Sequence, residues 1–204
     1  RGARSADNKL IDVVQFPLRG EWLSPNTPGT KIPSHGTNQL GTTYAYDFIQ
    51  VDWNRTGLPA YRVSPLQYLF FGVPLNEYYC WGQEIYAPCD GTVVVAEDGY
   101  EEGLEQIYSP IFHAYKNTHY FDPEKDDTRS VAGNYIIIEC GENVYAALCH
   151  LQSGSIQVSV GQKVKKGDFI GRIGHSGNSF APHLHFQLMD SCDITVANWI
   201  TLCF

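Results

Sequence analysis

The sequence predicts a mainly β fold: an antiparallel, sandwich-like β-sheet core with long loops and little helix. The chain holds 13 Tyr, 10 Phe, 19 Gly and 11 Pro among 204 residues, and its apolar runs are short. Turn-forming residues separate these runs, and no segment keeps apolar residues at helical spacing for three turns. Short strands joined by tight turns are typical of antiparallel sheets and barrel-like folds.

The expected strands follow the chain from its first third to its end. Their common feature is a run of β-branched, aromatic or other apolar residues bounded by turn signals such as Cys89-Asp90-Gly91 or Ser176-Gly177-Asn178. They cover residues 44–51, 84–87, 91–97, 134–139, 144–151, 155–158, 169–173 and 183–189.

The length predicts a single domain over residues 1–204. Within it we expect an irregular N-terminal segment at 1–33, an aromatic, loop-like insertion at 52–81 and a regular β core at 82–190. A second long connection at 98–132 carries the charged stretch 122–129, which is expected to be a solvated loop.

The charge and the apolar runs exclude several classes of partner. A net charge of −8 argues against nucleic acid and anionic membranes as partners, because both require a basic surface. No apolar run approaches the length of a transmembrane helix. Because the single methionine is Met189, we expect a processed or trimmed chain whose export signal is absent or already removed. A continuation beyond Phe204 stays open.

The six cysteines are too sparse for a disulfide-built scaffold, and none forms a Cys-x-x-Cys pair. Their spacing does not match a zinc ribbon. Small buried thiols and one to three disulfides both remain open.

The histidines carry the chemical signal. His183 and His185 are two residues apart in an expected strand, so their imidazoles leave the same face. His150 lies near the end of another strand. Asp47 stands in an apolar, aromatic context, where an isolated carboxylate would be costly to bury. A catalytic zinc site needs three protein ligands and an open position for water, and two histidines with one aspartate meet that need.

Four segments resemble the lysostaphin- or LytM-type zinc metallopeptidases, in that family's order. The first is Ser34-His35 followed by Tyr44-Ala45-Tyr46-Asp47-Phe48. The next two are Glu84-Ile85-Tyr86-Ala87-Pro88 with Asp90-Gly91-Thr92-Val93, and the pair of strands that leads to Cys149-His150-Leu151. The last and most specific runs from Val160-Gly161 through Gly174-His175-Ser176-Gly177 to Pro182-His183-Leu184-His185-Phe186.

This resemblance implies a duplicated hybrid motif fold, with the site in a groove across the sheet. It implies one Zn²⁺ per chain, bound by His35, Asp47 and His185, with His150 and His183 as unliganded catalytic residues and Asn134 as a nearby polar residue. It further implies hydrolysis of peptide bonds in the cross-bridge or stem peptide of bacterial peptidoglycan, by a protein that is extracellular or in the cell envelope. We expect a monomer.

The chain departs from the family pattern at two places. Eleven residues separate His35 from Asp47, where the family has three. The insertion at 52–81 begins next to Asp47, so we expect it to border the substrate groove and to influence access or specificity. His175 is expected to be structural, and His113 and His119 to be solvated loop residues.

Two other functions remain open at this point. The chain could be a non-catalytic LytM-like regulatory or binding module of the cell envelope, although such modules usually lose metal ligands. It could also be a lipoyl-like or phosphocarrier β domain, because the glycine and valine spacing after Val160 recurs in those folds. A phosphocarrier would not need Asp47 together with His35.

Overall fold

The computed structural model describes residues 3–4, 10–11, 14–57, 59–102, 106–107 and 127–202. Its fold is mainly β and antiparallel, which confirms the predicted class. The strands are β1 (Ala3–Arg4), β2 (Leu10–Ile11), β3 (Tyr46–Phe48), β4 (Val73–Pro74), β5 (Glu84–Tyr86), β6 (Gly91–Glu97), β7 (Gln106–Ile107), β8 (Asn134–Gly141), β9 (Val144–Leu151), β10 (Lys163–Val164), β11 (Phe169–Arg172), β12 (Leu184–Met189) and β13 (Trp199–Ile200).

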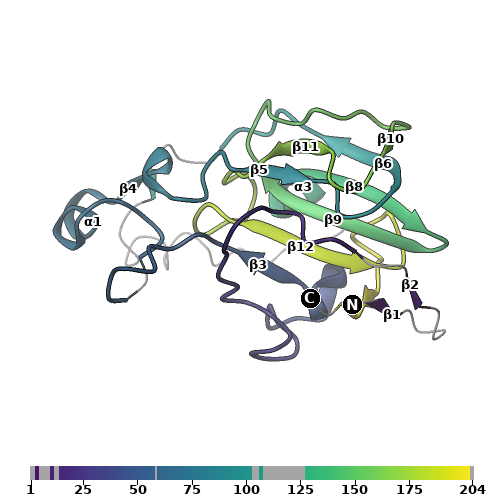
Figure 1. Cartoon of the computed structure of the whole chain (residues 1–204), viewed down its shortest axis with the longest axis horizontal. Coiled ribbons are helices and arrows are strands. Elements are labelled where there is room, and N and C mark those ends of the chain that lie inside the picture. Colours follow the sequence, from purple (N-terminus) through teal and green to yellow (C-terminus); the bar gives the residue numbers. More distant parts are fainter. Residues whose placement is uncertain are drawn as a thin grey trace.

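A seven-stranded antiparallel sheet forms the centre of the molecule (Figure 1). Its order is β10-β6-β8-β9-β12-β13, and β3 pairs with the first half of β12 on the edge that β13 shares. The long strands β8, β9 and β12 are rich in β-branched and aliphatic residues, which suit a sheet buried on both faces.

The two faces of this sheet have different roles. Leu184, Phe186 and Leu188 of β12 point into the larger hydrophobic core. His185, between the first two, therefore points to the opposite face, because successive side chains in a strand alternate. A smaller cluster that includes Cys149 and Met189 covers part of that second face.

A two-stranded sheet of β5 and β11 closes the larger core. Ile85 and Ile170 of these strands are fully buried in that core, so the β5–β11 sheet packs on the face that His185 does not share. A disulfide joins Cys89, just before β6, to Cys140 near the end of β8. Cys80, Cys149 and Cys192 are free thiols. Both possibilities that the sequence left open for the cysteines thus occur in the chain.

The insertion at 52–81 is more structured than expected. It contains α1 (Pro65–Phe71), β4 and the 3₁₀-helix η2 (Leu75–Glu77). Figure 1 shows α1 well away from the central strands. An isolated bridge between Tyr61 and Tyr78 closes the base of this excursion. Beyond it, the thiol of Cys80 donates to the carbonyl of Pro182 at 3.0 Å, next to His183.

One expected strand is wrong. Residues 155–158 form no strand. The amide of Gln157 donates to Ile170 O of β11 at 3.0 Å, but the amide of Ile156 donates to a carboxylate oxygen of Asp98 at 3.2 Å, so no continuous ladder develops. The other expected strands are present, most of them with slightly different ends. His113, His119 and residues 122–126 lie outside the described ranges, and so does most of the 98–132 connection.

Helices are few and short. Besides α1 and η2, the described chain has η1 (Gln39–Tyr44) and α3 (Thr128–Ala132). Within the described ranges, no helix has the length and apolar character that a membrane crossing requires.

Candidate metal centre

Asp47 lies at the centre of a cluster of histidines. The β3–β12 register places Asp47 directly opposite His185, so the two side chains share one face of the sheet. Asp47 Oδ1 is 3.0 Å from His185 Nδ1, and Asp47 Oδ2 is 2.9 Å from His35 Nε2. One ligand atom from each of His35, Asp47 and His185 lies within 4.8 Å of the others.

The long spacing between His35 and Asp47 is taken up by a closed loop. Residues 39–44 form η1, and the amide of Ser34 donates to Thr43 O at 3.0 Å, which returns the chain to its starting point. Ser34 is completely buried and holds the neighbouring His35 against Asp47. Extra loop length costs little free energy, so this departure from the family pattern still brings the two residues together.

His150 and His183 stand beside this group. Ligand atoms of His150, His183 and His185 also lie within 4.8 Å of one another, so His185 belongs to two overlapping groups. His183 Nε2 is 3.5 Å from Asp47 Oδ1, and the rings of His150 and His183 have centroids 4.6 Å apart. All five residues that the sequence singled out therefore form one cluster.

A β-bulge turns His150 toward the cluster. The β8–β9 register shifts here, so that Cys149 and His150 stand opposite the single residue Tyr135. The φ of His150 is +63°, in the left-handed region. With regular alternation His150 would point to the face opposite Cys149; the extra residue re-aims it toward His185.

The hydrogen bonds of His35 and His185 leave their inward nitrogens without protons. Ser34 Oγ donates to Thr42 O at 3.0 Å, so it accepts from His35 Nδ1–H at 2.9 Å. His185 Nε2–H donates to the amide oxygen of Gln187 at 2.9 Å. His35 Nε2 and His185 Nδ1 therefore direct lone pairs at the Asp47 carboxylate.

Such converging lone pairs repel one another unless a cation lies between them. A divalent metal ion accepts all of them at once, and an outer hydrogen bond on the second ring nitrogen is the usual partner of a metal-binding histidine. His35, Asp47 and His185 thus fit a metal site by their donor chemistry.

The two flanking histidines also have fixed tautomers. His150 Nδ1 is 2.8 Å from Ser176 O, and His183 Nδ1 is 2.7 Å from Ala181 O. A carbonyl oxygen can only accept, so both Nδ1 atoms carry the proton. In the neutral rings each Nε2 is consequently free to accept a proton on the side of the cluster.

Burial and mutual contacts set the charges. Burial would raise the pKa of Asp47, which is 6% exposed, but the neighbouring His183 opposes this effect, and the pKa lies far below its usual range. Burial lowers the pKa of His35 and, with the nearby His183 and His185, lowers that of His150 well below its ordinary value. Burial also lowers the pKa of His183, but Asp47 more than compensates and raises it.

Two supporting residues were missed by the sequence reasoning. Asn26 Nδ2 donates to Asp47 Oδ2 at 2.8 Å, and Gln187 is the acceptor for His185 described above. Gln187 lies two residues after His185 in the same strand. Residues i and i+2 of a strand share a face, so this spacing could have indicated that Gln187 lies beside His185. Asn26 lies in the irregular N-terminal segment 1–33, where no sequence pattern marked it. Asn134 is fully buried, and its side chain bonds the backbone of Tyr100 and Leu151 rather than the cluster.

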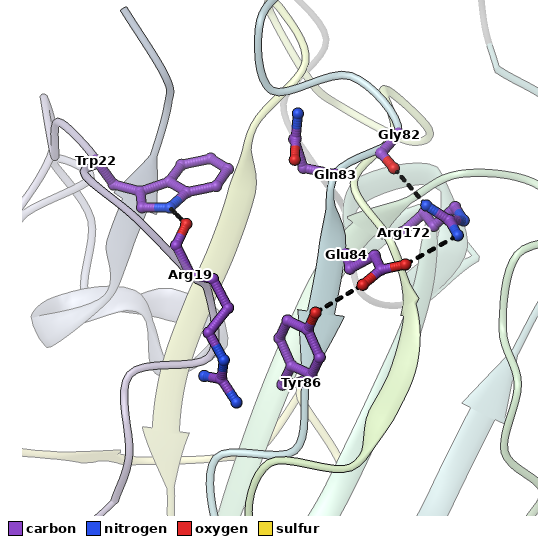
Figure 2. A pocket seen from close by; sticks show the side chains of 7 residues that line it. All are labelled: Arg19, Trp22, Gly82, Gln83, Glu84, Tyr86 and Arg172. Atoms are coloured by element: carbon purple, nitrogen blue, oxygen red, sulfur yellow. Dashed lines mark hydrogen bonds and ion pairs between the residues drawn. The ribbon is translucent and has the colours of Figure 1, made fainter.

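A separate pocket of about 340 Å³ lies on the outer side of β5 and β11. Figure 2 shows Trp22 and Arg19 on one side of it and Glu84, Tyr86 and Arg172 on the other. Glu84 accepts hydrogen bonds from both Tyr86 and Arg172, so the polar side chains on this side of the pocket are largely paired with one another. Because Ile85 points into the larger core, the neighbouring Glu84 and Tyr86 point away from that core to the outer side of β5. The pocket that they line is therefore separate from the histidine cluster.

An antiparallel sheet that carries a buried His–Asp–His group, with two further imidazoles beside it, has the chemistry of a hydrolytic metal centre. The family model for peptidase family M23 matches residues 77–195, which is more than half of the chain. The chain belongs to this family. The matched region includes His150, His183 and His185 and begins after His35 and Asp47.

Individual relatives match over shorter stretches. The chain is 41% identical over 58 residues to the peptidoglycan DD-endopeptidase ShyA of Vibrio cholerae, and 39% identical over 70 residues to the endolysin 2638A of a Staphylococcus phage. These alignments cover 28% and 32% of this chain, and 13% and 14% of the two relatives.

A solved structure supports the fold over most of the chain. It is a putative glycyl-glycine endopeptidase LytM from Ruminococcus gnavus, which matches with a TM-score of 0.50 and 15% identity. The match covers 93% of this chain and 57% of that one.

Proposed function

We propose that the chain is a zinc-dependent endopeptidase that hydrolyses peptide bonds in the cross-bridge or stem peptide of bacterial peptidoglycan. The observation that carries this proposal is the convergence of lone pairs from His35, Asp47 and His185 beside two imidazoles with fixed tautomers. Membership of peptidase family M23 supports the class of reaction.

One zinc ion would be held by His35, Asp47 and His185. The competing group of His150, His183 and His185 lacks a carboxylate, and a metal there would leave the buried Asp47 charge without its strongest counter-charge. When bound, zinc supplies Lewis-acid polarisation of the scissile carbonyl and lowers the pKa of a water to about 7. Three protein ligands would leave the fourth position of a tetrahedral zinc ion for that water.

His150 and His183 would handle protons at the scissile bond. Each Nε2 can accept a proton from the attacking water and return it to the amine that leaves. Once protonated, the same nitrogen can donate a hydrogen bond to the oxyanion that develops on the carbonyl. The hydrogen bonds from Nδ1 to Ser176 O and Ala181 O keep both rings oriented for this exchange.

A setting outside the cytoplasm, extracellular or in the cell envelope, agrees with the Cys89–Cys140 disulfide, because such bonds persist in oxidising compartments. The relatives also carry names of cell-wall enzymes. In this proposal, residues 1–204 form one peptidase domain, and the protein acts as a monomer. The irregular segment 1–33 contributes Asn26. The insertion 52–81 would border the substrate groove near its end, where Cys80 donates to Pro182 O beside His183.

Metal analysis combined with turnover tests the division of roles. We expect one zinc per chain, and loss of both zinc and hydrolysis in His185→Ala and Asp47→Asn. His150→Asn and His183→Ala should keep zinc and lose about 10²–10⁴-fold in turnover. Asp190→Asn, an exposed carboxylate just after β12, is the control and should change neither. Loss of zinc from the His150 or His183 variant would instead favour the three-imidazole group.

Digestion of purified peptidoglycan followed by mass spectrometry tests the substrate. The printed names of the relatives concern two bonds, the DD cross-link and the glycyl-glycine bond, so wall preparations with each type should be compared. Zinc binding without cleavage of any preparation would favour the non-catalytic envelope module. A chain that binds no zinc but accepts a phosphoryl or lipoyl group would favour the carrier domain.

A further inference from the structure

A buried hydroxyl lies between two histidines behind the cluster. Ser179 is 6% exposed, and its Oγ is 3.0 Å from His175 Nδ1 and 3.1 Å from His183 Nδ1. The same hydroxyl donates to Ala181 O at 2.8 Å. Neither the family resemblance nor the proposed mechanism gives a role to Ser179 or His175.

The protons in this network can be placed one by one. His183 Nδ1 carries a proton, because it lies 2.7 Å from Ala181 O. With the Ser179 proton also directed at Ala181 O, the two lone pairs of the serine oxygen face His175 Nδ1 and His183 Nδ1. A hydroxyl offers one donor and two acceptor positions, so all three are used. Both imidazoles then carry their protons on Nδ1.

The segment that carries these residues is held firmly. The amide of His175 donates to a carboxylate oxygen of Glu102 at 2.6 Å, and the amide of Gly174 donates to His150 O at 3.0 Å. A side chain at Gly174 would collide with the backbone of Gln152, so the segment packs against the chain just beyond β9. Ser176, in the same segment, accepts from His150 Nδ1. Residues 174–179 therefore contact both flanking histidines.

We propose that Ser179, oriented by His175, is a positioning residue for His183 in the hydrolysis proposed above, on which this inference rests. Ala181 O fixes the tautomer of His183. Ser179 Oγ, as a second acceptor of the same Nδ1–H, fixes the plane of the ring, so that Nε2 stays directed at Asp47 and the reacting groups. Ser179 does not touch the substrate, and it acts only through His183.

Removal of the hydroxyl tests this role. Ser179→Ala should lower kcat with KM and zinc content unchanged. By analogy with the loss of an outer hydrogen bond on a metal-binding histidine, we expect a decrease of about 10–100-fold. Ser179→Thr keeps the hydroxyl and should recover most of the rate. Ser155→Ala is the matched control: Ser155 is 9% exposed and its hydroxyl bonds Arg172 twice, but it touches no histidine.

A second pair of variants addresses the other side of the serine. The amide nitrogen of asparagine can stand where His175 Nδ1 stands, so His175→Asn should retain kcat, whereas His175→Leu should lose it as Ser179→Ala does. This pair keeps the proposal testable if the alanine variant fails to fold.

A spectroscopic measurement separates this inference from the proposed function. In zinc-loaded chain with ¹⁵N-labelled histidine, His183 should show the Nδ1–H tautomer, and Ser179→Ala should broaden or shift that signal. The measurement needs no turnover, so it decides the role of Ser179 even if the wild-type chain cleaves no peptidoglycan. A Ser179→Ala variant with kcat within twofold of wild type and an unchanged His183 signal would overturn the proposal.

Discussion

The backbone of His150 has a left-handed φ of +63°, a conformation that residues other than glycine adopt infrequently. It results from the bulge opposite Tyr135, which places Cys149 and His150 on the same face of the sheet. Local strain of this kind persists where the surrounding structure enforces it, and it is common at functional sites. The sequence could place His150 near the end of a strand, but a one-residue bulge leaves no trace in an apolar pattern.

Glycine should therefore be favoured over alanine at position 150. In metal-free protein, His150→Gly should be more stable than His150→Ala by about 1 kcal/mol, because only alanine keeps the steric cost of the left-handed region. At Cys149 the order should reverse, with alanine more stable than glycine. Denaturant unfolding of the four variants measures both differences. The same order at both positions would show that His150 is not held in the left-handed conformation.

The pH dependence of stability should also identify His150. Its pKa is lowered by burial well below the ordinary 6.5, so below that pH the unfolded chain binds more protons than the folded chain. Stability then falls on acidification, by up to about 1.4 kcal/mol per pH unit from this one group. The raised pKa of His183 acts in the opposite sense: its contribution is present below pH 6.5 and is lost as the pH rises above it.

Urea unfolding of metal-free wild type and His150→Asn between pH 7.5 and 5 measures the effect. Asparagine tolerates the left-handed region and does not titrate, so the wild type should lose more stability than the variant below pH 6.5. Equal losses would mean that His150 is not kept neutral by the fold.

At the scale of elements, the strands that carry the cluster were predictable and their partners were not. Turn residues and apolar runs gave β6, β9 and β12 nearly to their ends. The pairing of Asp47 with His185 depends on the long-range β3–β12 register, which no local pattern encodes. Helix α1 was missed although Ser64 and Pro65 are typical of a helix start, because its apolar residues follow one another without periodicity.

The Cys89–Cys140 disulfide should contribute substantially to stability. It joins positions 51 residues apart, for which the chain-entropy model gives about 4 kcal/mol. The double variant Cys89→Ala/Cys140→Ala should lose about that amount in denaturant unfolding, and a reducing agent should destabilise the wild type but not the variant. Cys192→Ser, at an exposed free thiol, is the control. A loss below about 1 kcal/mol would contradict a disulfide at these positions.

At the scale of the whole molecule, the side of the sheet that bears the cluster differs from its covered side. The larger core and the β5–β11 sheet lie on one face, and the histidines occupy the other. The end of the insertion reaches the segment before His183 from the larger core, where Cys80 is buried and donates to Pro182 O. Burial raises the pKa of the Cys80 thiol to about 12, so it stays protonated and keeps donating to Pro182. The sequence indicated that the insertion starts beside Asp47, but not that it also returns beside His183.

The exposed side chains of α1 should affect the polymeric substrate more than they affect the fold. Leu66, Leu69, Phe70 and Phe71 are 55–72% exposed. Replacing all four by glutamine should leave stability and zinc content nearly unchanged, since exposed substitutions usually change stability by less than about 0.5 kcal/mol each. If the insertion guides the wall to the groove, KM should rise for intact peptidoglycan and stay constant for a short soluble peptide. Unchanged kinetics on both would show that α1 plays no part in recognition.

The bridge between Tyr61 and Tyr78 has a consequence for how such a protein can diversify. The chain leaves the body of the molecule and returns to it at the same place. Val63, Val73 and Leu75 of this excursion are buried in the larger core, but α1 contributes only the partly buried Tyr68 to it. Each doubling of the length of such a closed loop costs only about 0.6 kcal/mol in loop-closure free energy. Mutation and insertion can therefore accumulate on the exposed side of α1 without disturbing Asp47 or His183, so a lineage could adapt to walls of a new composition by altering these positions alone.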